Sequence, residues 1–188
     1  MRTQLFLTAG GLAAALLAGP AAPLAAATGH GSGSGDRVDT GLRPLVSYHA
    51  EYVPAGATAR VRAHYRPGGK TLVKLRVRGL IPNRAYGAHA HQKACHPTDG
   101  AAAGGHFQYV QDPVQPSTDP AYANPDNEIW LDFTTDARGE ATARALVDWQ
   151  FPADRRAHSV IVHDHRTRTG PGEAGVAGPR HGCLTVPF

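Results

Sequence analysis

The 188-residue chain has little sulfur: it holds two cysteines, and Met1 is its single methionine. Aromatic residues make up only 7% of the chain. Basic residues do not form runs interleaved with aromatic ones, which is the pattern typical of nucleic-acid binding. We therefore expect no nucleic-acid partner, although the mild positive excess, +4 over the whole chain, could help to attract a small anionic substrate.

The sequence also lacks an apolar run long enough to span a membrane. Its one apolar stretch, Leu5–Leu17, is interrupted by glycines, whereas a spanning helix needs about 20 apolar residues. This stretch follows Arg2 and precedes three alanines at 25–27, so residues 1–27 are typical of a secretory signal peptide. We predict that the peptide is cleaved and that the mature protein is secreted or extracytoplasmic, in the cell envelope.

Residues 28–41 are rich in glycine and serine, which predicts a flexible linker. From residue 42 onward, short β-like runs alternate with proline and glycine, and no convincing amphipathic helix occurs. The expected strands lie at residues 46–53, 57–65, 72–77, 86–91, 128–133, 141–149, 158–163 and 183–186. The first two are expected to pair across the turn at 54–56.

About eight short strands joined by turns predict one all-β domain over residues 42–188. The expected architecture is an eight-stranded Greek-key β-barrel or an immunoglobulin-like β-sandwich. Two stretches without periodicity, residues 92–127 and 164–179, are crowded with glycine, proline and polar residues. Loops of this length inside a compact domain are usually functional.

Export determines how the two cysteines are interpreted. In an oxidising compartment an isolated pair of cysteines usually forms a disulfide. We therefore expect Cys95 to be bonded to Cys183. The bond would close a long loop and stabilise the fold by about 4–5 kcal/mol in the chain-entropy picture.

Eleven histidines are a high count for this length. His89 and His91 alternate along an expected strand, which places both imidazoles on one face. His106 follows two glycines that allow close backbone approach, and His163 ends an apolar strand. Four imidazoles from three segments suit a borderline transition metal, and a flattened all-nitrogen site favours Cu(II). Copper is therefore the expected cofactor.

Four segments, taken in order, resemble the copper/zinc superoxide dismutase family. They are Gly87–His91 with Cys95, then Ala103–Phe107, Ser159–His163 and Gly178–Cys183. Their order and approximate spacing are similar to the family pattern over residues 46–186, which is nearly the whole expected domain.

The resemblance implies a Greek-key β-barrel that converts superoxide to oxygen and hydrogen peroxide. It implies four copper ligands: His89, His91, His106 and His163. It also implies a disulfide between Cys95 and Cys183. Arg180 matches the family's active-site arginine, whose fixed cationic donors would guide the superoxide anion to the metal. His106 would release copper in the reduced state and carry a proton, so Arg180 and His106 are the expected catalytic residues.

The sequence departs from the family pattern where zinc would bind. Copper/zinc members use two further histidines and an aspartate, whereas residues 107–128 contain no histidine. Carboxylates with one histidine make a poor tetrahedral zinc site, so the pattern is similar to the copper-only branch. Without zinc, the second ring nitrogen of His106 needs another partner. We expect Asp126 or Glu128 to accept its hydrogen bond, which would fix the tautomer of the ligand.

A second function fits the same fold: a non-enzymatic domain that binds or buffers copper. Arg180 favours the enzyme, because metal storage needs no anion guide, whereas the missing zinc ligands favour the binding domain. A blue-copper electron-transfer site is excluded, because no histidine follows Cys183 and no methionine follows Met1.

Two further imidazoles leave the ligand set open. His165 forms a second His-x-His pair with His163, and His181 lies two residues before Cys183. The sequence does not decide whether either of them takes part in metal binding. It does not indicate the number of subunits either.

Overall fold

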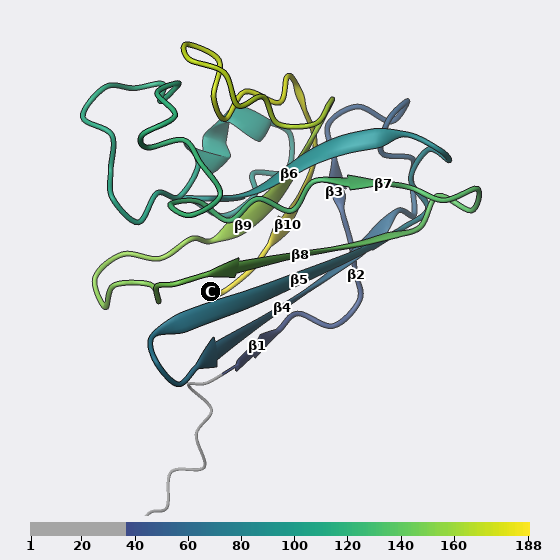
Figure 1. Cartoon of the computed structure of the whole chain (residues 1–188). Coiled ribbons are helices and arrows are strands. Elements are labelled where there is room, and N and C mark those ends of the chain that lie inside the picture. Colours follow the sequence, from purple (N-terminus) through teal and green to yellow (C-terminus); the bar gives the residue numbers. More distant parts are fainter. Residues whose placement is uncertain (1–36) are drawn as a thin grey trace, which may run out of the picture. The chain divides into compact units, whose positions relative to one another are not determined.

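The computed structural model describes residues 37–188, which form two antiparallel sheets packed face to face (Figure 1). The first sheet has the order β1-β4-β5-β8, with β2 also paired to β4. Its strands are β1 (Arg37–Asp39), β2 (Arg43–Pro44), β4 (Thr58–Arg66), β5 (Lys70–Arg78) and β8 (Ala141–Val147). The second sheet has the order β3-β10-β9-β6-β7. Its strands are β3 (Val46–Ser47), β6 (Ala85–His91), β7 (Phe133–Thr134), β9 (Ser159–His163) and β10 (Arg180–Thr185).

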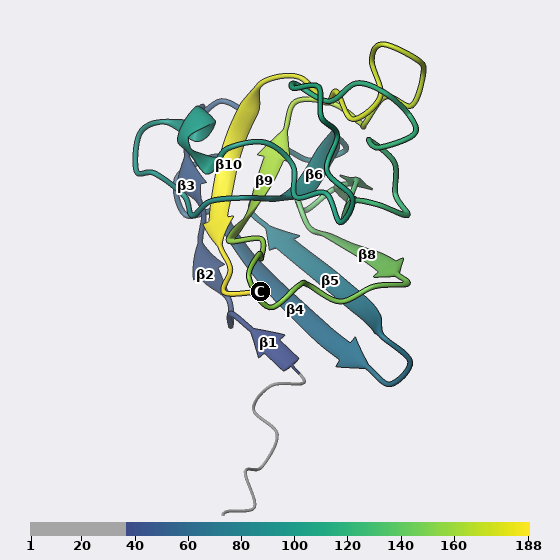
Figure 2. The same ribbon diagram turned by 90° about the vertical axis from the view of Figure 1, so that its left-hand side faces the viewer.

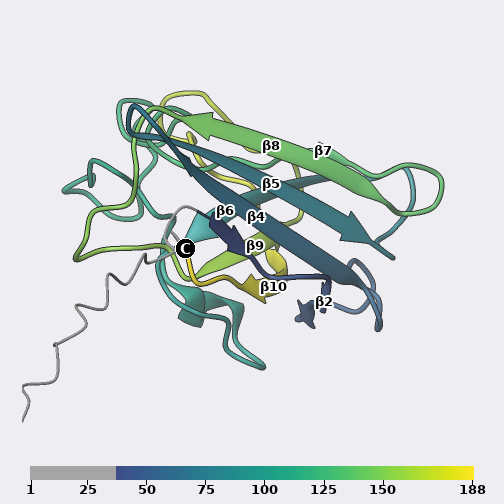
Figure 3. The same cartoon turned by 90° about the horizontal axis from the view of Figure 1, so that it is seen from below.

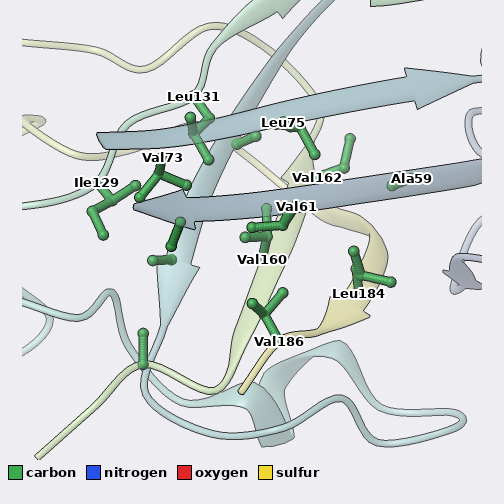
Figure 4. Close-up of a cluster of buried hydrophobic side chains, with 14 of the residues drawn as sticks. Ala59, Val61, Val73, Leu75, Ile129, Leu131, Val160, Val162, Leu184 and Val186 are labelled. Atoms are coloured by element: carbon green, nitrogen blue, oxygen red, sulfur yellow. The ribbon is translucent and has the colours of Figure 1, made fainter. Parts of the chain in front are cut away.

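The core lies between the sheets because apolar residues alternate with polar ones along the long strands. In β4 and β5, Val61 and Val73 are fully buried, whereas Lys74 on the opposite face is exposed. The side chains of Val61 and Val73 pack in the same core as Val160 and Val162 from the second sheet (Figure 4). Each fully buried side chain of this size contributes about 1.5–3 kcal/mol through removal of apolar surface from water.

The all-β prediction is confirmed, and the architecture is the sandwich, because the two sheets do not close into a barrel. The predicted pairing of residues 46–53 with 57–65 is wrong. Val46 pairs with Cys183 of β10, whereas β4 pairs along its whole length with β5. The turn through Gly68 and Gly69, both at φ +78°, joins β4 directly to β5, and only glycine adopts this backbone freely.

The first sheet includes residues that precede residue 42, the start of the all-β domain expected from the sequence. Strand β1 pairs with β4, and its Asp39 accepts hydrogen bonds from Arg60 and Arg62. These contacts place residues 37–39 in the sheet and not in the linker expected at 28–41. The predicted signal peptide (1–27) and the rest of the predicted linker lie outside the described residues. Within residues 37–188, no helix is long and apolar enough to cross a membrane.

Two long loops lie over the outer face of the second sheet (Figures 1 and 2). The first loop, residues 92–127, contains the short 3₁₀ helix η1 (Gly100–Ala103), and the second loop spans residues 164–179. The Cys95–Cys183 disulfide is present and ties the first loop to β10. Gly87 on β6 lets the second loop approach closely, because a Cβ there would lie 2.5 Å from the His165 carbonyl oxygen.

Candidate metal centre

Four histidines meet on the outer face of the second sheet, beneath the two loops. β6 presents His89 and His91, and pairing of β6 with β9 sets His163 opposite Gly87. His106 comes from the first loop, where an isolated bridge pairs it with His91. One ring nitrogen from each histidine lies within 4.8 Å of the other three. Nitrogen atoms gathered this closely can hold a single metal ion.

Hydrogen bonds on the far side of the rings determine which nitrogen faces the cluster. Nδ1 of His91 lies 3.0 Å from the Gly104 carbonyl oxygen, and Nδ1 of His163 lies 3.1 Å from that of Gly178. A carbonyl only accepts, so both Nδ1 atoms carry the proton and both Nε2 atoms keep a lone pair. These two Nε2 atoms are 3.2 Å apart. Two facing lone pairs repel one another, and a cation between them would remove this cost.

His89 presents its other nitrogen to the cluster. Its Nε2 lies 2.6 Å from the Thr167 hydroxyl oxygen, which lies 2.7 Å from Asp132 Oδ1. The hydroxyl donates its one proton to the carboxylate and therefore accepts from Nε2–H of His89. Nδ1 of His89 then keeps its lone pair, and it is buried without a hydrogen-bond partner. Buried polar atoms are rarely left unpaired, so this nitrogen fits a metal ligand.

The reasoning from sequence missed Thr167 and Asp132. Asp132 had a usable signal, because it alternates with Glu128 and Trp130 on the polar side of the expected strand at 128–133. Thr167 had none, since it lies in the aperiodic second loop. Its position depends on its own backbone N–H, which donates to Asp132 Oδ2 at 2.7 Å.

Glu128 holds His106. Its Oε2 lies 2.7 Å from His106 Nδ1 and 2.7 Å from Trp130 Nε1, and its Oε1 accepts from Gln108 Nε2 at 2.8 Å. The carboxylate is only 1% exposed, and three donors converge on it. With Nδ1 of His106 donating to Glu128, Nε2 is the nitrogen with the lone pair. Of the two carboxylates considered from the sequence, Asp126 makes no hydrogen bond to His106 within the described residues.

Burial keeps the rings of His89, His91 and His163 neutral. Desolvation, followed by repulsion from His106 and the other rings, lowers the pKa of His89 and His91 well below the usual value. The same causes lower the pKa of His163 to about 3. Metal binding requires the neutral ring, so near neutral pH these three histidines are ready to bind without losing a proton.

Arg180 lies at the mouth of the same site. A pocket of about 330 Å³ is lined by Arg180, His106, His163 and Glu128, together with residues of both loops. The guanidinium donates from Nη1 to the Gly100 carbonyl oxygen at 2.7 Å, which fixes its position. Burial lowers the pKa of Arg180, yet arginine remains a cation at every physiological pH. The pocket therefore combines a fixed positive charge with two of the four histidines, His106 and His163.

The two additional histidines lie outside the cluster. Nδ1 of His165 lies 2.8 Å from the carbonyl oxygen of Arg166. The ring of His181 is stacked on Tyr52 and hydrogen-bonded through Nε2 to Asp164 at 2.9 Å. Neither residue contributes a nitrogen to the four-histidine group.

Comparison with solved structures confirms the resemblance at the level of fold: the chain has the fold of copper/zinc superoxide dismutases. The Cu/Zn superoxide dismutase from Brucella abortus is 20% identical over 79% of this chain and 98% of that chain, with a TM-score of 0.54. Neither protein-family models nor curated protein sequences gave a match.

Proteins with other descriptions share this fold. A double mutant of a SOD-like protein from Bacillus subtilis is 16% identical over 77% of this chain and 95% of that chain, with a TM-score of 0.58. The clock protein EA4 is 17% identical over 80% of this chain and 93% of that chain, with a TM-score of 0.56. At this identity the comparisons establish the fold, and the activity has to be argued from the site.

Proposed function

We propose that this protein is an exported, copper-dependent superoxide dismutase. The observation that carries the proposal is the convergence of four ring-nitrogen lone pairs, two of them from histidines that line the same pocket as the anchored cation of Arg180. A metal site alone would suit storage. The arginine adds a docking point for a small anion beside the metal ligands, and this is what a reaction of superoxide requires.

Copper fits the donor set better than zinc. An all-imidazole site with four nitrogen ligands is typical of Cu(II). Structural zinc in this fold would need a bridging histidine, but Nδ1 of His106 already donates to the buried Glu128. Residues 107–128 supply no other histidine. The proposal is therefore the copper-only form of the enzyme.

Copper held by these four nitrogens would supply the one-electron chemistry, accepting an electron from one superoxide and returning it to the next. Arg180 would bind and orient the incoming anion at the pocket mouth. His106 Nε2 would take up and release a proton, while Glu128 keeps the ring in place through Nδ1. The two loops would limit access by water and larger solutes to the remaining sides of the site.

The compartment is part of the proposal. The Cys95–Cys183 disulfide fits an extracytoplasmic protein. Export by cleavage after residue 27 remains a prediction from the sequence, and N-terminal sequencing of the mature protein from its producing cells checks it.

The first test measures metal content and superoxide dismutation on the copper-loaded protein and on three variants. We expect about one copper and little zinc per chain. His163→Ala should lose both copper and activity. Arg180→Ala should keep its copper, because the hydrogen bonds of this side chain go to the carbonyl oxygens of Gly100 and Ala101 and not to the rings. It should lose about tenfold or more in rate through loss of anion steering. Arg180→Lys, which keeps the charge, should retain more activity than Arg180→Ala.

The same measurement decides the alternative function, a non-enzymatic copper-binding or copper-buffering domain. Stoichiometric copper with no dismutation above the free-copper background would establish that alternative. Equal amounts of copper and zinc would contradict the copper-only assignment.

Glu128→Gln is expected to weaken copper binding by about 10- to 100-fold, the usual cost of removing a group that orients a metal-binding histidine. The glutamine amide has one acceptor oxygen, whereas three donors converge on the carboxylate, so at least one donor would face an N–H group. Competition with a copper chelator measures the affinity. Asp126→Asn is the matched control: it removes the same charge nearby, and its affinity should equal that of the unchanged protein. Equal affinities for both variants would contradict the role of Glu128.

A further inference from the structure

The outward face of the first sheet carries an unusual concentration of positive charge. In β1, β4, β5 and β8, the positions that point away from the core hold nine basic residues and one acidic residue, Asp39. The rest of the chain from residue 37 to 188 holds nine basic and 13 acidic residues. The excess positive charge of the domain is therefore confined to this surface, which we call the basic face. Figure 3 views the strands β8, β5 and β4 that form it.

Strand pairing brings like charges into direct opposition at the centre of the basic face. Arg60 lies opposite Arg76, and Lys74 lies between Arg62 on one side and Arg144 on the other. Like charges directly opposite in a sheet destabilise it. The fold thus carries a cost, which the ion pairs of Asp39 and Glu140 and the hydrophobic core must offset.

Carboxylates neutralise only part of this charge. Asp39 forms ion pairs with Arg60 at 2.5 Å and Arg62 at 3.1 Å, and these guanidinium groups hold the pKa of its carboxyl well below its usual range. Glu140 pairs with Arg76 at 3.3 Å and with Arg78 at 3.6 Å, and Asp148 pairs with Lys70 at 2.7 Å. Within residues 37–188, Lys74 and Arg144 form no ion pair. The centre of the face therefore holds more cations than carboxylates, because Arg60 and Arg62 share Asp39 and Lys74 has no carboxylate partner among the described residues.

A shallow depression of about 170 Å³ lies at this centre, and Arg60, Arg62, Lys74, Arg76 and Thr142 line it. The planar guanidinium group of arginine can donate two parallel hydrogen bonds to the oxygens of a sulfate or phosphate group. Two carboxylates, Asp39 and Glu140, pair with the three arginines of the depression, so its four cations keep a net positive charge that is complementary to such a group. The other cations of the basic face are complementary to further groups on the same molecule.

The shape and chemistry of the face favour a flexible polymer over other polyanions. Strands in a sheet twist, so a pliable chain can follow these cations where a planar bilayer would contact only some of them. No phenylalanine, tyrosine or tryptophan occupies an outward position of the four strands, so the face lacks the stacking platforms that bind nucleic-acid bases.

We propose that the basic face binds a flexible linear polyanion bearing sulfate or phosphate groups. The metal centre lies on the second sheet, with the core between it and this face (Figure 1). A chain bound in this way keeps the pocket of Arg180 open to solution. The inference is independent of the enzymatic proposal, because it uses none of the residues of that site.

Binding to heparin and to inorganic polyphosphate tests the proposal on the mature, copper-loaded protein. We expect binding that weakens about 10- to 100-fold between about 50 and 200 mM salt, as for a few ionic contacts. Lys74→Glu should weaken binding by about tenfold or more. It places a carboxylate between Arg62 and Arg144, so its melting temperature should not fall, and a loss of binding cannot be attributed to misfolding. Its copper content and dismutase activity should be unchanged.

Lys93→Glu is the matched control, because it changes the net charge equally but lies in the first loop, over the second sheet. It should bind both polymers nearly as well as the unchanged protein. Binding of Lys74→Glu equal to that of the unchanged protein would overturn the proposal, as would an equal loss in both variants. Tighter binding to anionic lipid vesicles or duplex DNA than to heparin at the same salt would overturn the choice of occupant.

Discussion

Loss of the Cys95–Cys183 disulfide is expected to lower the free energy of unfolding by about 4–5 kcal/mol. The bond joins residues 88 positions apart, and a cross-link over a loop of this length removes that much chain entropy from the unfolded state. A domain of this size has only about 5–15 kcal/mol of stability in total. Urea unfolding of the double variant Cys95→Ala and Cys183→Ala, compared with the unchanged protein, measures the difference.

Loss of the disulfide should also disturb the candidate metal centre. The bond anchors the segment that supplies the Gly100 carbonyl for Arg180 and the Gly104 carbonyl for His91. We therefore expect the double variant to lose dismutase activity even where it is still folded, with a smaller loss of bound copper. A stability change below about 1 kcal/mol would mean that the unfolded chain is already compact across this loop. Unchanged activity would mean that other contacts position Arg180.

The metal-free protein is expected to lose several kcal/mol of stability as the pH falls from about 6.5 toward 3. Burial lowers the folded-state pKa of His89, His91 and His163 below the unfolded value of about 6.5. In this window the unfolded chain binds more protons than the folded one, so stability rises with pH and is fully present above about pH 6.5. Denaturant unfolding in the presence of a chelator, repeated across this range, measures the effect.

His163→Gln provides the control for the acid effect. Glutamine does not titrate, so the slope of stability against pH between about 5 and 6.5 should fall by up to about 1.4 kcal/mol per pH unit, equivalent to one proton. Carboxylates contribute little there, because their unfolded pKa values lie near 4. A flat profile in the unchanged protein would show that its histidines are protonated equally in both states.

Much of the fold could be predicted from the sequence because alternation is a local property. The runs at 57–65 and 72–77 alternate apolar and charged residues, and they are strands β4 and β5. The same rule placed His89 and His91 on one face of β6 before any tertiary contact was known. It did not give the partner of each strand. Val46 pairs with β10, more than 130 residues away, because pairing depends on how the whole chain packs.

The residue types of the candidate centre can be read directly from the sequence: four histidines, an arginine, a pair of cysteines and the lack of further histidines in residues 107–128. Which nitrogen of each ring faces the cluster follows from the folded structure alone. That choice depends on partners distant in sequence, 78 residues in the case of Thr167 and His89, and 22 for Glu128 and His106.

The basic face was beyond the reach of sequence for the same reason. Its charges occupy alternate positions of separate strands, so the sequence contains no basic run, only single residues scattered among apolar ones. Strand pairing sets Lys74 between Arg62 and Arg144, which are 82 residues apart. Alternation is fixed by the geometry of one strand, whereas the proximity of charges and hydrogen-bond partners arises only when strands pair and the sheets pack.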